Sequence, residues 1–273
     1  MTSKIQVRKF INIILIVEFV LASCELKLKP FDSNKQNTTI KIARYDRLQS
    51  CYLTTGDYSV LQEMNTEYPV ETRTLIEKVL QIGDVFDPNI SSKYLRFYQD
   101  STLQTLISDT EAEYADMDDL TIMFNKSFKK IRRWLPNVPL PKIYTQIGSL
   151  DQSVIIGNKS IGICLDKYLG ANYPLYMKYY SQQQRSSMTR AHIVPESLVF
   201  YLLSFYPLSN IEKRTQLERD LHIGKIMWVV NKAVDEKFFK TKYVLLIDNY
   251  MRKNRDKTIE QLLLHDNYTA LLP

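Results

Sequence analysis

The scarcity of glycine in an aromatic-rich chain restricts its fold more than any other feature. There are 7 Gly among 273 residues, against 18 Tyr and 11 Phe. Glycine supplies the positive φ angles of many tight turns, so a chain with so little of it favours helices over hairpins. The hydrophobic content of 45% is ample for a core. We therefore predict an α+β fold that is predominantly helical, with a small sheet packed against the helices.

Periodic apolar residues place the helices. The clearest helix begins near Asp118 or Asp119, which can cap it, and its apolar residues recur at three- and four-residue steps as far as Leu135. Cations fill its other face, which we interpret as solvated in preference to membrane-bound: Lys126, Lys129, Lys130, Arg132 and Arg133. Further helices are expected from Pro69 and over 196–206, 211–234, 243–251 and 258–264.

Short alternating or continuous apolar runs place the strands. We expect a first strand over 39–45 and another over 142–147. The runs 153–156 and 160–165 flank Gly157-Asn-Lys159, which is typical of a tight hairpin turn.

The N-terminal segment carries a lipoprotein signal. Lys4, Arg8 and Lys9 precede the apolar run 10–20, which is interrupted only by Asn12 and Glu18, and the lipobox Leu21-Ala-Ser-Cys24 follows. The sequence therefore predicts a signal peptide over 1–23, lipidation of Cys24, a polar tether over 24–38 and a single domain over 39–273. The expected location is the cell envelope of a Gram-negative bacterium, anchored to membrane through lipid, with the outer membrane favoured. An uncleaved N-terminal anchor is the alternative.

The charge pattern indicates which partners to expect, and the position of the remaining cysteines indicates whether they form a disulfide. The formal charge of +6 is interspersed along the chain, and we expect no nucleic-acid partner. Cys51 and Cys164 remain after lipidation, and an exported chain can pair them. Cys164 lies in an apolar run, so a buried free thiol is favoured over a disulfide.

Motifs for catalysis and cofactor binding are absent from the sequence. It has three histidines, His192, His222 and His265, and no His-Glu-x-x-His, phosphate loop or nucleophile elbow. His192 and Glu196 are four apart, but Pro195 between them disfavours a continuous helical turn. We predict no catalytic residue, no metal and no cofactor.

The most unusual cluster is aromatic. Five tyrosines occur within thirteen residues, and four of them are candidates for lining a ligand groove: Tyr168, Tyr173, Tyr176 and Tyr180. A core role with a hydrogen-bonded hydroxyl is the favoured interpretation of the cluster.

Several segments, taken in order, resemble the family of gliding-motility lipoproteins called GldB. The resemblance covers roughly residues 20–232, and its most specific piece is Leu165-Asp-Lys-Tyr-Leu-Gly170. The other pieces are Arg44-Tyr-Asp46, Trp134-Leu-Pro136, Pro141-Lys-Ile-Tyr-Thr145, Tyr173-Pro-Leu-Tyr176 and Gly224-Lys-Ile-Met-Trp228. The tail from Lys232 onward departs from the family pattern.

The resemblance implies a scaffold related to zinc-dependent peptidases, without its metal. The helix expected to carry the zinc-binding motif, 196–206, has no histidine, and Ile223 stands where the family is expected to be acidic. The expected function is a non-catalytic envelope lipoprotein that binds or stabilises proteins of the gliding or secretion machinery. The alternatives are a metal-dependent hydrolase that uses His192, Glu196 and His222, and a carbohydrate-binding lipoprotein that uses the tyrosines.

Overall fold

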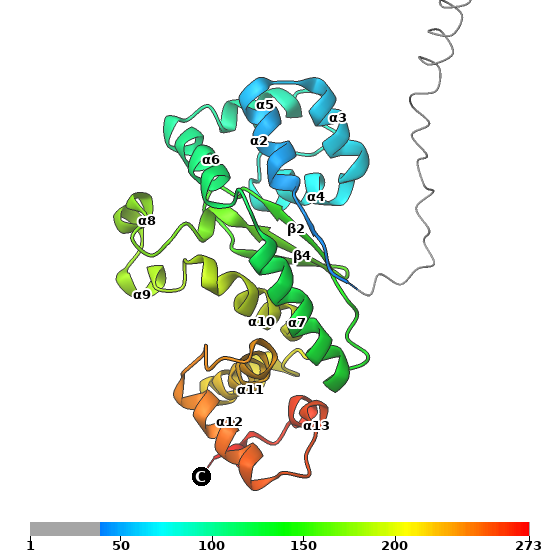
Figure 1. Cartoon of the computed structure of the whole chain (residues 1–273), viewed down its shortest axis with the longest axis vertical. Helices are drawn as coiled ribbons and strands as arrows, with labels where there is room; N and C mark the ends of the chain where they lie inside the picture. Colours follow the sequence, from blue (N-terminus) through cyan, green and yellow to red (C-terminus); the bar gives the residue numbers. More distant parts are fainter. Residues whose placement is uncertain (1–38, 273) are drawn as a thin grey trace, which may run out of the picture. The chain divides into compact units, whose positions relative to one another are not determined.

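Residues 39–272 are described by a computed structural model of the chain (Figure 1). The expected signal peptide, the lipidation site Cys24 and the tether lie outside the described residues. Among residues 39–272, no helix combines the length and the apolar character needed to cross a membrane.

A four-stranded sheet with the order β1-β2-β4-β3 forms the centre of the fold. β1 (Ile42–Ala43), β2 (Lys142–Gln146) and β4 (Ser160–Cys164) run parallel, and β3 (Val154–Gly157) pairs antiparallel with β4. Gly157 pairs with Ser160, so the predicted hairpin turn is confirmed. The predicted strand over 39–45 is reduced to two residues, because the chain turns into a helix at Tyr45.

The two faces of the sheet contact two different hydrophobic clusters. Successive side chains of a strand point to opposite faces, so Ile143 packs into one cluster and Tyr144 into the other. Gly162 of β4 lies against the Tyr144 ring, where an added Cβ would come within 2.5 Å of ring and hydroxyl atoms. A residue larger than glycine would therefore require the Tyr144 ring to move.

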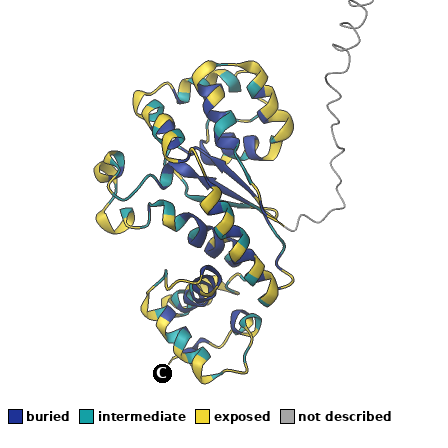
Figure 2. Cartoon of the chain, in the orientation of Figure 1, coloured by how far each residue is buried: buried dark blue, intermediate teal, exposed yellow. Residues whose placement is uncertain are grey.

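The helices before residue 114 cover the Tyr144 face. Figure 2 shows that they bury their inner surfaces and expose their outer ones. They are α2 (Tyr45–Thr55), α3 (Tyr58–Glu67), α4 (Pro69–Thr74) with a π-helical turn at Leu75–Val79, α5 (Ile90–Phe97) and α6 (Ser101–Glu113). The predicted start of a helix at Pro69 is confirmed, and Pro69 occupies its first turn.

The Ile143 face is covered by α7 (Asp118–Trp134) and α10 (Ile193–Phe205), and α11 (Gln216–Val234) packs against both. α12 (Lys242–Lys253) and α13 (Ile259–Leu264) pack against α11, and the short helices α8 (Pro174–Tyr179) and α9 (Gln182–Arg185) lie apart from them (Figure 1). The α+β fold with mostly helices and a small sheet is confirmed.

Three local predictions about helices need correction. The helix predicted over 211–234 is interrupted, because Thr215 caps α11 by accepting a hydrogen bond from the Glu218 backbone. Asp118 is the first residue of α7 and not its cap; Asp116 instead accepts from the Asp118 backbone N–H. Pro195 does not separate His192 from Glu196, because it stands in the first turn of α10, where its missing N–H costs no hydrogen bond.

Candidate functional site

The candidate site is built on the loop 148–150 and on the buried carboxylate that holds it. Asp166 is fully buried and accepts hydrogen bonds from the Gly148 and Leu150 backbone N–H groups, at 2.7 and 2.6 Å. Ser149 and Leu150 have positive φ angles of 51° and 66°, which L-residues rarely adopt. The Asp166 carboxylate therefore fixes a strained loop conformation from inside the fold.

A cavity of about 250 Å³ lies beside this loop, and we call it the Tyr168–Glu196 pocket. It is lined by Ser153, Lys167, Tyr168, Tyr180, Gln184, Ser187, Met188 and Glu196. Ser153 directly precedes β3, and the other polar side chains come from three places: the segment after β4, the α8–α9 region and the first turn of α10. All three belong to the stretch that begins with the predicted motif Leu165-Asp-Lys-Tyr-Leu-Gly170.

A hydrogen-bonded acid and phenol form one wall of the pocket. Tyr168 Oη donates to Glu196 Oε2 at 2.8 Å, and Tyr114 Oη donates to the Tyr168 carbonyl at 2.6 Å. Burial raises the pKa of Glu196 above its usual range. Burial, followed by the neighbouring Glu196 carboxylate, raises the pKa of Tyr168 well above its usual value. The wall therefore offers a carboxyl group and a neutral hydroxyl.

A lysine and a tyrosine form another wall. Lys167 Nζ donates to the Leu150 carbonyl at 3.1 Å and to Tyr180 Oη at 3.2 Å. Tyr180 Oη donates in turn to the Leu150 carbonyl at 3.1 Å, and Lys167 Nζ lies 4.5 Å from the centre of the Tyr180 ring. These contacts tie the lysine and the ring to the loop that Asp166 holds. The pocket thus presents an ammonium group and a carboxyl group at fixed positions.

The four tyrosines considered as candidates for one ligand groove occupy different positions. Tyr168 and Tyr180 line the Tyr168–Glu196 pocket, and Tyr180 also borders a more open cavity of about 630 Å³ with Tyr179, Gln81 and the loop 149–151. Tyr173 lies at a separate cavity, where its hydroxyl donates to Asp109 Oδ2 at 2.7 Å. Tyr176 is buried; its hydroxyl donates to the Asp166 carbonyl and accepts from the Leu169 N–H.

The histidines considered for metal binding are held by other contacts. His222 Nε2 lies 2.9 Å from the Tyr206 carbonyl, which can only accept, so this nitrogen carries the proton. Its Nδ1 then accepts from Tyr268 Oη at 2.9 Å, and no ring nitrogen is left for a metal. His192 Nδ1 lies 2.8 Å from Thr189 Oγ1. Within residues 39–272, no three His, Cys, Asp or Glu side chains are grouped so that they could hold a metal ion.

The two cysteines within residues 39–272 are separate free thiols. Cys51 is exposed on α2, and Cys164 is buried at the end of β4. The prediction of a buried free thiol at Cys164 is confirmed, and the alternative disulfide is not present.

Sequence reasoning missed two parts of the site. The motif Leu165-Asp-Lys-Tyr-Leu-Gly170 contains Asp166 and Lys167, but no role was predicted for them. A charged pair directly after a buried strand is a signal of a site at the end of that strand. The bond between Tyr168 and Glu196 joins residues 28 apart in the sequence, and no local pattern announces it.

The fold and the pocket define a mostly helical α+β protein whose polar site is built on the segment after β4. A family profile described as gliding motility protein GldB matches residues 27–243. The chain therefore belongs to the GldB family of gliding-motility lipoproteins, proteins of the bacterial cell envelope. The match reaches eleven residues beyond Lys232, so the departure predicted from that residue begins later. Searches of curated proteins and of solved structures return no match.

Proposed function

We propose that this chain is a non-catalytic envelope lipoprotein, anchored through Cys24, that binds a peptide segment of a protein of the gliding or secretion machinery. Membership of a gliding-motility lipoprotein family supports the envelope location and the connection with gliding. The outer membrane of a Gram-negative bacterium is the location that we favour. The relation of the scaffold to zinc-dependent peptidases remains a prediction.

The observation that carries the binding role is the continuity between the Tyr168–Glu196 pocket and an exposed aromatic surface. Tyr180 borders both the pocket and the more open cavity, and Tyr179 lines the latter with 63% of its surface exposed. Met177 on the same helix is 54% exposed. Polar groups that converge in a pocket can pair with peptide amides, and exposed aromatic and Met side chains suit contacts with a partner's apolar residues.

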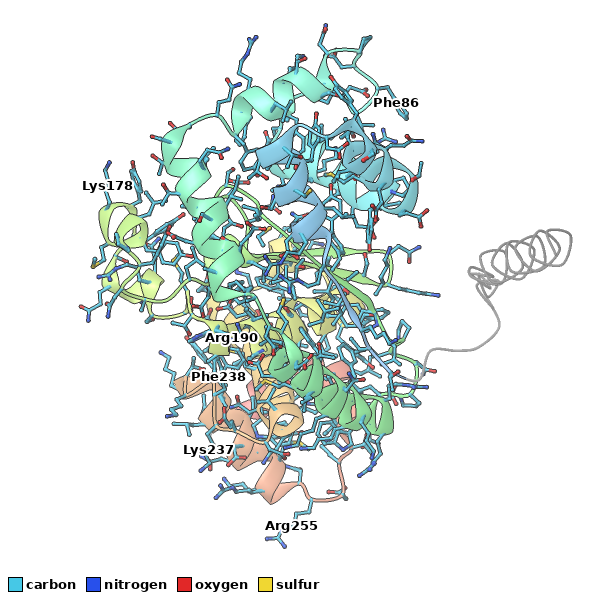
Figure 3. All side chains as sticks on the ribbon, turned by 45° about the horizontal axis from the view of Figure 1, so that its top comes forward. Phe86, Lys178, Arg190, Lys237, Phe238 and Arg255 are labelled. Atoms are coloured by element: carbon cyan, nitrogen blue, oxygen red, sulfur yellow. The ribbon has the colours of Figure 1, made fainter. Side chains whose placement is uncertain are left out.

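Site-specific photo-crosslinking in the native bacterium tests this role. A photoreactive residue at Tyr179 should give an adduct of defined mass, which Glu196→Gln should weaken because the carboxylate loses charge while the side chain keeps its shape. Phe86, 78% exposed and distant from Lys178 of α8 in Figure 3, is the matched control position. Labelling at Tyr179 that does not exceed labelling at Phe86 would contradict the proposal.

Two further measurements address the anchor and the alternative chemistry. Cys24→Ser should release the protein from the membrane fraction and abolish acyl labelling; unchanged fractionation would remove the anchor from the proposal. Elemental analysis of protein purified without chelator tests the metal-dependent hydrolase. Stoichiometric zinc that disappears in His222→Ala would overturn the non-catalytic role.

A further inference from the structure

The exposed face of α7 carries cations that the fold does not use. Lys129, Arg132 and Arg133 are exposed and form no ion pair within residues 39–272; together they are the α7 basic face. At about 100° per residue, these three side chains fall within an arc of about 100°. Lys126 and Lys130 of the same helix pair with Asp235 and are therefore not counted. Ile122, 67% exposed, lies in the same arc two turns earlier.

The structure places this face beside the point where the domain begins. The Asn125 side chain bonds both backbone groups of Ile40: Oδ1 accepts from the N–H at 2.8 Å, and Nδ2 donates to the carbonyl at 2.9 Å. Ile40 is itself buried. Lys129 follows Asn125 by one turn and Arg133 by two, which is about 6 and 12 Å along the helix. In Figure 1, α7 and the start of β1 lie side by side, as these hydrogen bonds require.

More cations lie at the end of the sheet where the chain enters it. β1, β2 and β4 are parallel, so their first residues share one end of the sheet, the end at which the chain enters it. Lys41 precedes Ile42, and the Lys159 carbonyl accepts from the Lys142 N–H at 2.9 Å. Lys41 and Lys159 are exposed and, among the described residues, without an ion pair, whereas Lys142 pairs with Glu71.

We propose that the α7 basic face, which the sequence pattern alone led us to interpret as solvated, rests on an anionic phospholipid surface and holds the folded domain against the bilayer to which Cys24 is anchored. The proposal rests on the lipid anchor of the proposed function. Cys24 and Thr39 are 15 residues apart, a length of chain that spans at most about 50 Å. Anchoring within that reach gives the basic face a high effective concentration at the surface, so a weak electrostatic attraction is sufficient.

The test uses the mature lipoprotein, reconstituted into vesicles of phosphatidylcholine alone or with roughly 30% phosphatidylglycerol. A membrane-impermeant acylating reagent labels exposed lysines, and mass spectrometry gives the ratio of labelling at Lys129 to that at Lys178. Figure 3 shows Lys178 on α8, at the edge of the domain. The ratio should fall at least about threefold on anionic vesicles at low salt and recover in about 0.5 M NaCl, where charges are screened.

Two matched variants remove two arginines each. Arg132→Gln with Arg133→Gln should abolish the protection of Lys129, which stays in place as the reporter. Arg96→Gln with Arg255→Gln removes two exposed arginines elsewhere, also without an ion pair in the described part of the chain, and should leave the protection intact. Circular dichroism of each variant checks that the fold is unchanged.

The outcomes separate the two proposals. Protein that floats with both vesicle types, but shows the same Lys129 ratio on each, refutes the docking of α7 while the anchor stands. Protein that fails to float with neutral vesicles refutes the anchor, and the docking inference with it. Equal loss of protection in both double variants refutes a specific role of the α7 basic face.

Discussion

Asp166 allows a quantitative test of how the candidate site is held together. Its carboxyl group is fully buried, and burial raises its pKa from 3.8 to about 6 against the lowering effect of the Gly148 and Leu150 N–H bonds. Because the folded-state pKa is the higher one, the native protein binds a proton that the unfolded chain releases between these two values. The stabilisation is fully present below about pH 4 and is lost as the pH rises through 6.

The size of the effect follows from the two pKa values. Integrating the proton linkage from about pH 7 to pH 5 gives a contribution of about 1.3 kcal/mol to the free energy of unfolding, larger at the lower pH. Asp166→Asn removes the titration while keeping the shape of the side chain. The free energy of unfolding of the wild type minus that of Asp166→Asn should therefore rise by about 1.3 kcal/mol from pH 7 to pH 5.

Urea unfolding of the detergent-solubilised protein at pH 7, 6 and 5 measures this difference. Contributions of the other carboxylates cancel, because both proteins carry them. Asp151→Asn, an exposed position that directly follows the loop 148–150, is the matched control. A difference between wild type and Asp166→Asn that stays constant over this range would show that Asp166 does not titrate there, and a pKa raised by burial to about 6 would be wrong.

Three further predictions concern the rest of the fold. Burial lowers the pKa of Lys225 to about 8, so the free energy of unfolding of the wild type minus that of Lys225→Met should rise by about 1.3 kcal/mol from pH 7 to pH 9 in urea titrations; a flat difference would contradict it. Gly162→Ala should lower the melting temperature through a clash of its Cβ with Tyr144, at a cost of about 1–3 kcal/mol; an unchanged melting temperature would refute the close approach. Maleimide should label Cys51 in the folded protein and Cys164 only after unfolding; rapid labelling of both would exclude the burial of Cys164.

Local sequence patterns were sufficient to predict an element where its own residues determine its structure. The apolar steps of 118–135 predicted α7 because a helix must direct one face to the core, and the hairpin at 157–160 followed from its turn residues. Local sequence patterns failed where the structure of an element depends on the segment beside it. The predicted strand at 39–45 is short because Tyr45 already belongs to α2. The break in the helix from 211, by contrast, has a local signal, because Thr215-x-x-Glu218 is a capping box that marks the start of α11.

The same division holds for the candidate site. Tyr168 and Tyr180, two of the four groove candidates in the tyrosine-rich segment, line the pocket, whereas the favoured interpretation of that segment was a core role. The candidates also included Tyr176, which the fold turns inward to bond Asp166 and Leu169. From the sequence, Glu196 was considered only as a possible metal ligand, whereas in the structure it accepts a hydrogen bond from the Tyr168 hydroxyl. Such pairings depend on how α10 packs beside the segment after β4, and periodicity carries no information about that packing.

The sequence by itself determined the class of fold, the family and the expected lipid anchor, because each depends on composition or on residues close together in the chain. Only the tertiary structure decided which residues meet at the pocket and where the basic face of α7 lies relative to the start of the domain. The physical reason is that hydrophobic periodicity indicates which side of an element is buried. The residues that this side contacts are determined by packing between elements far apart in the sequence.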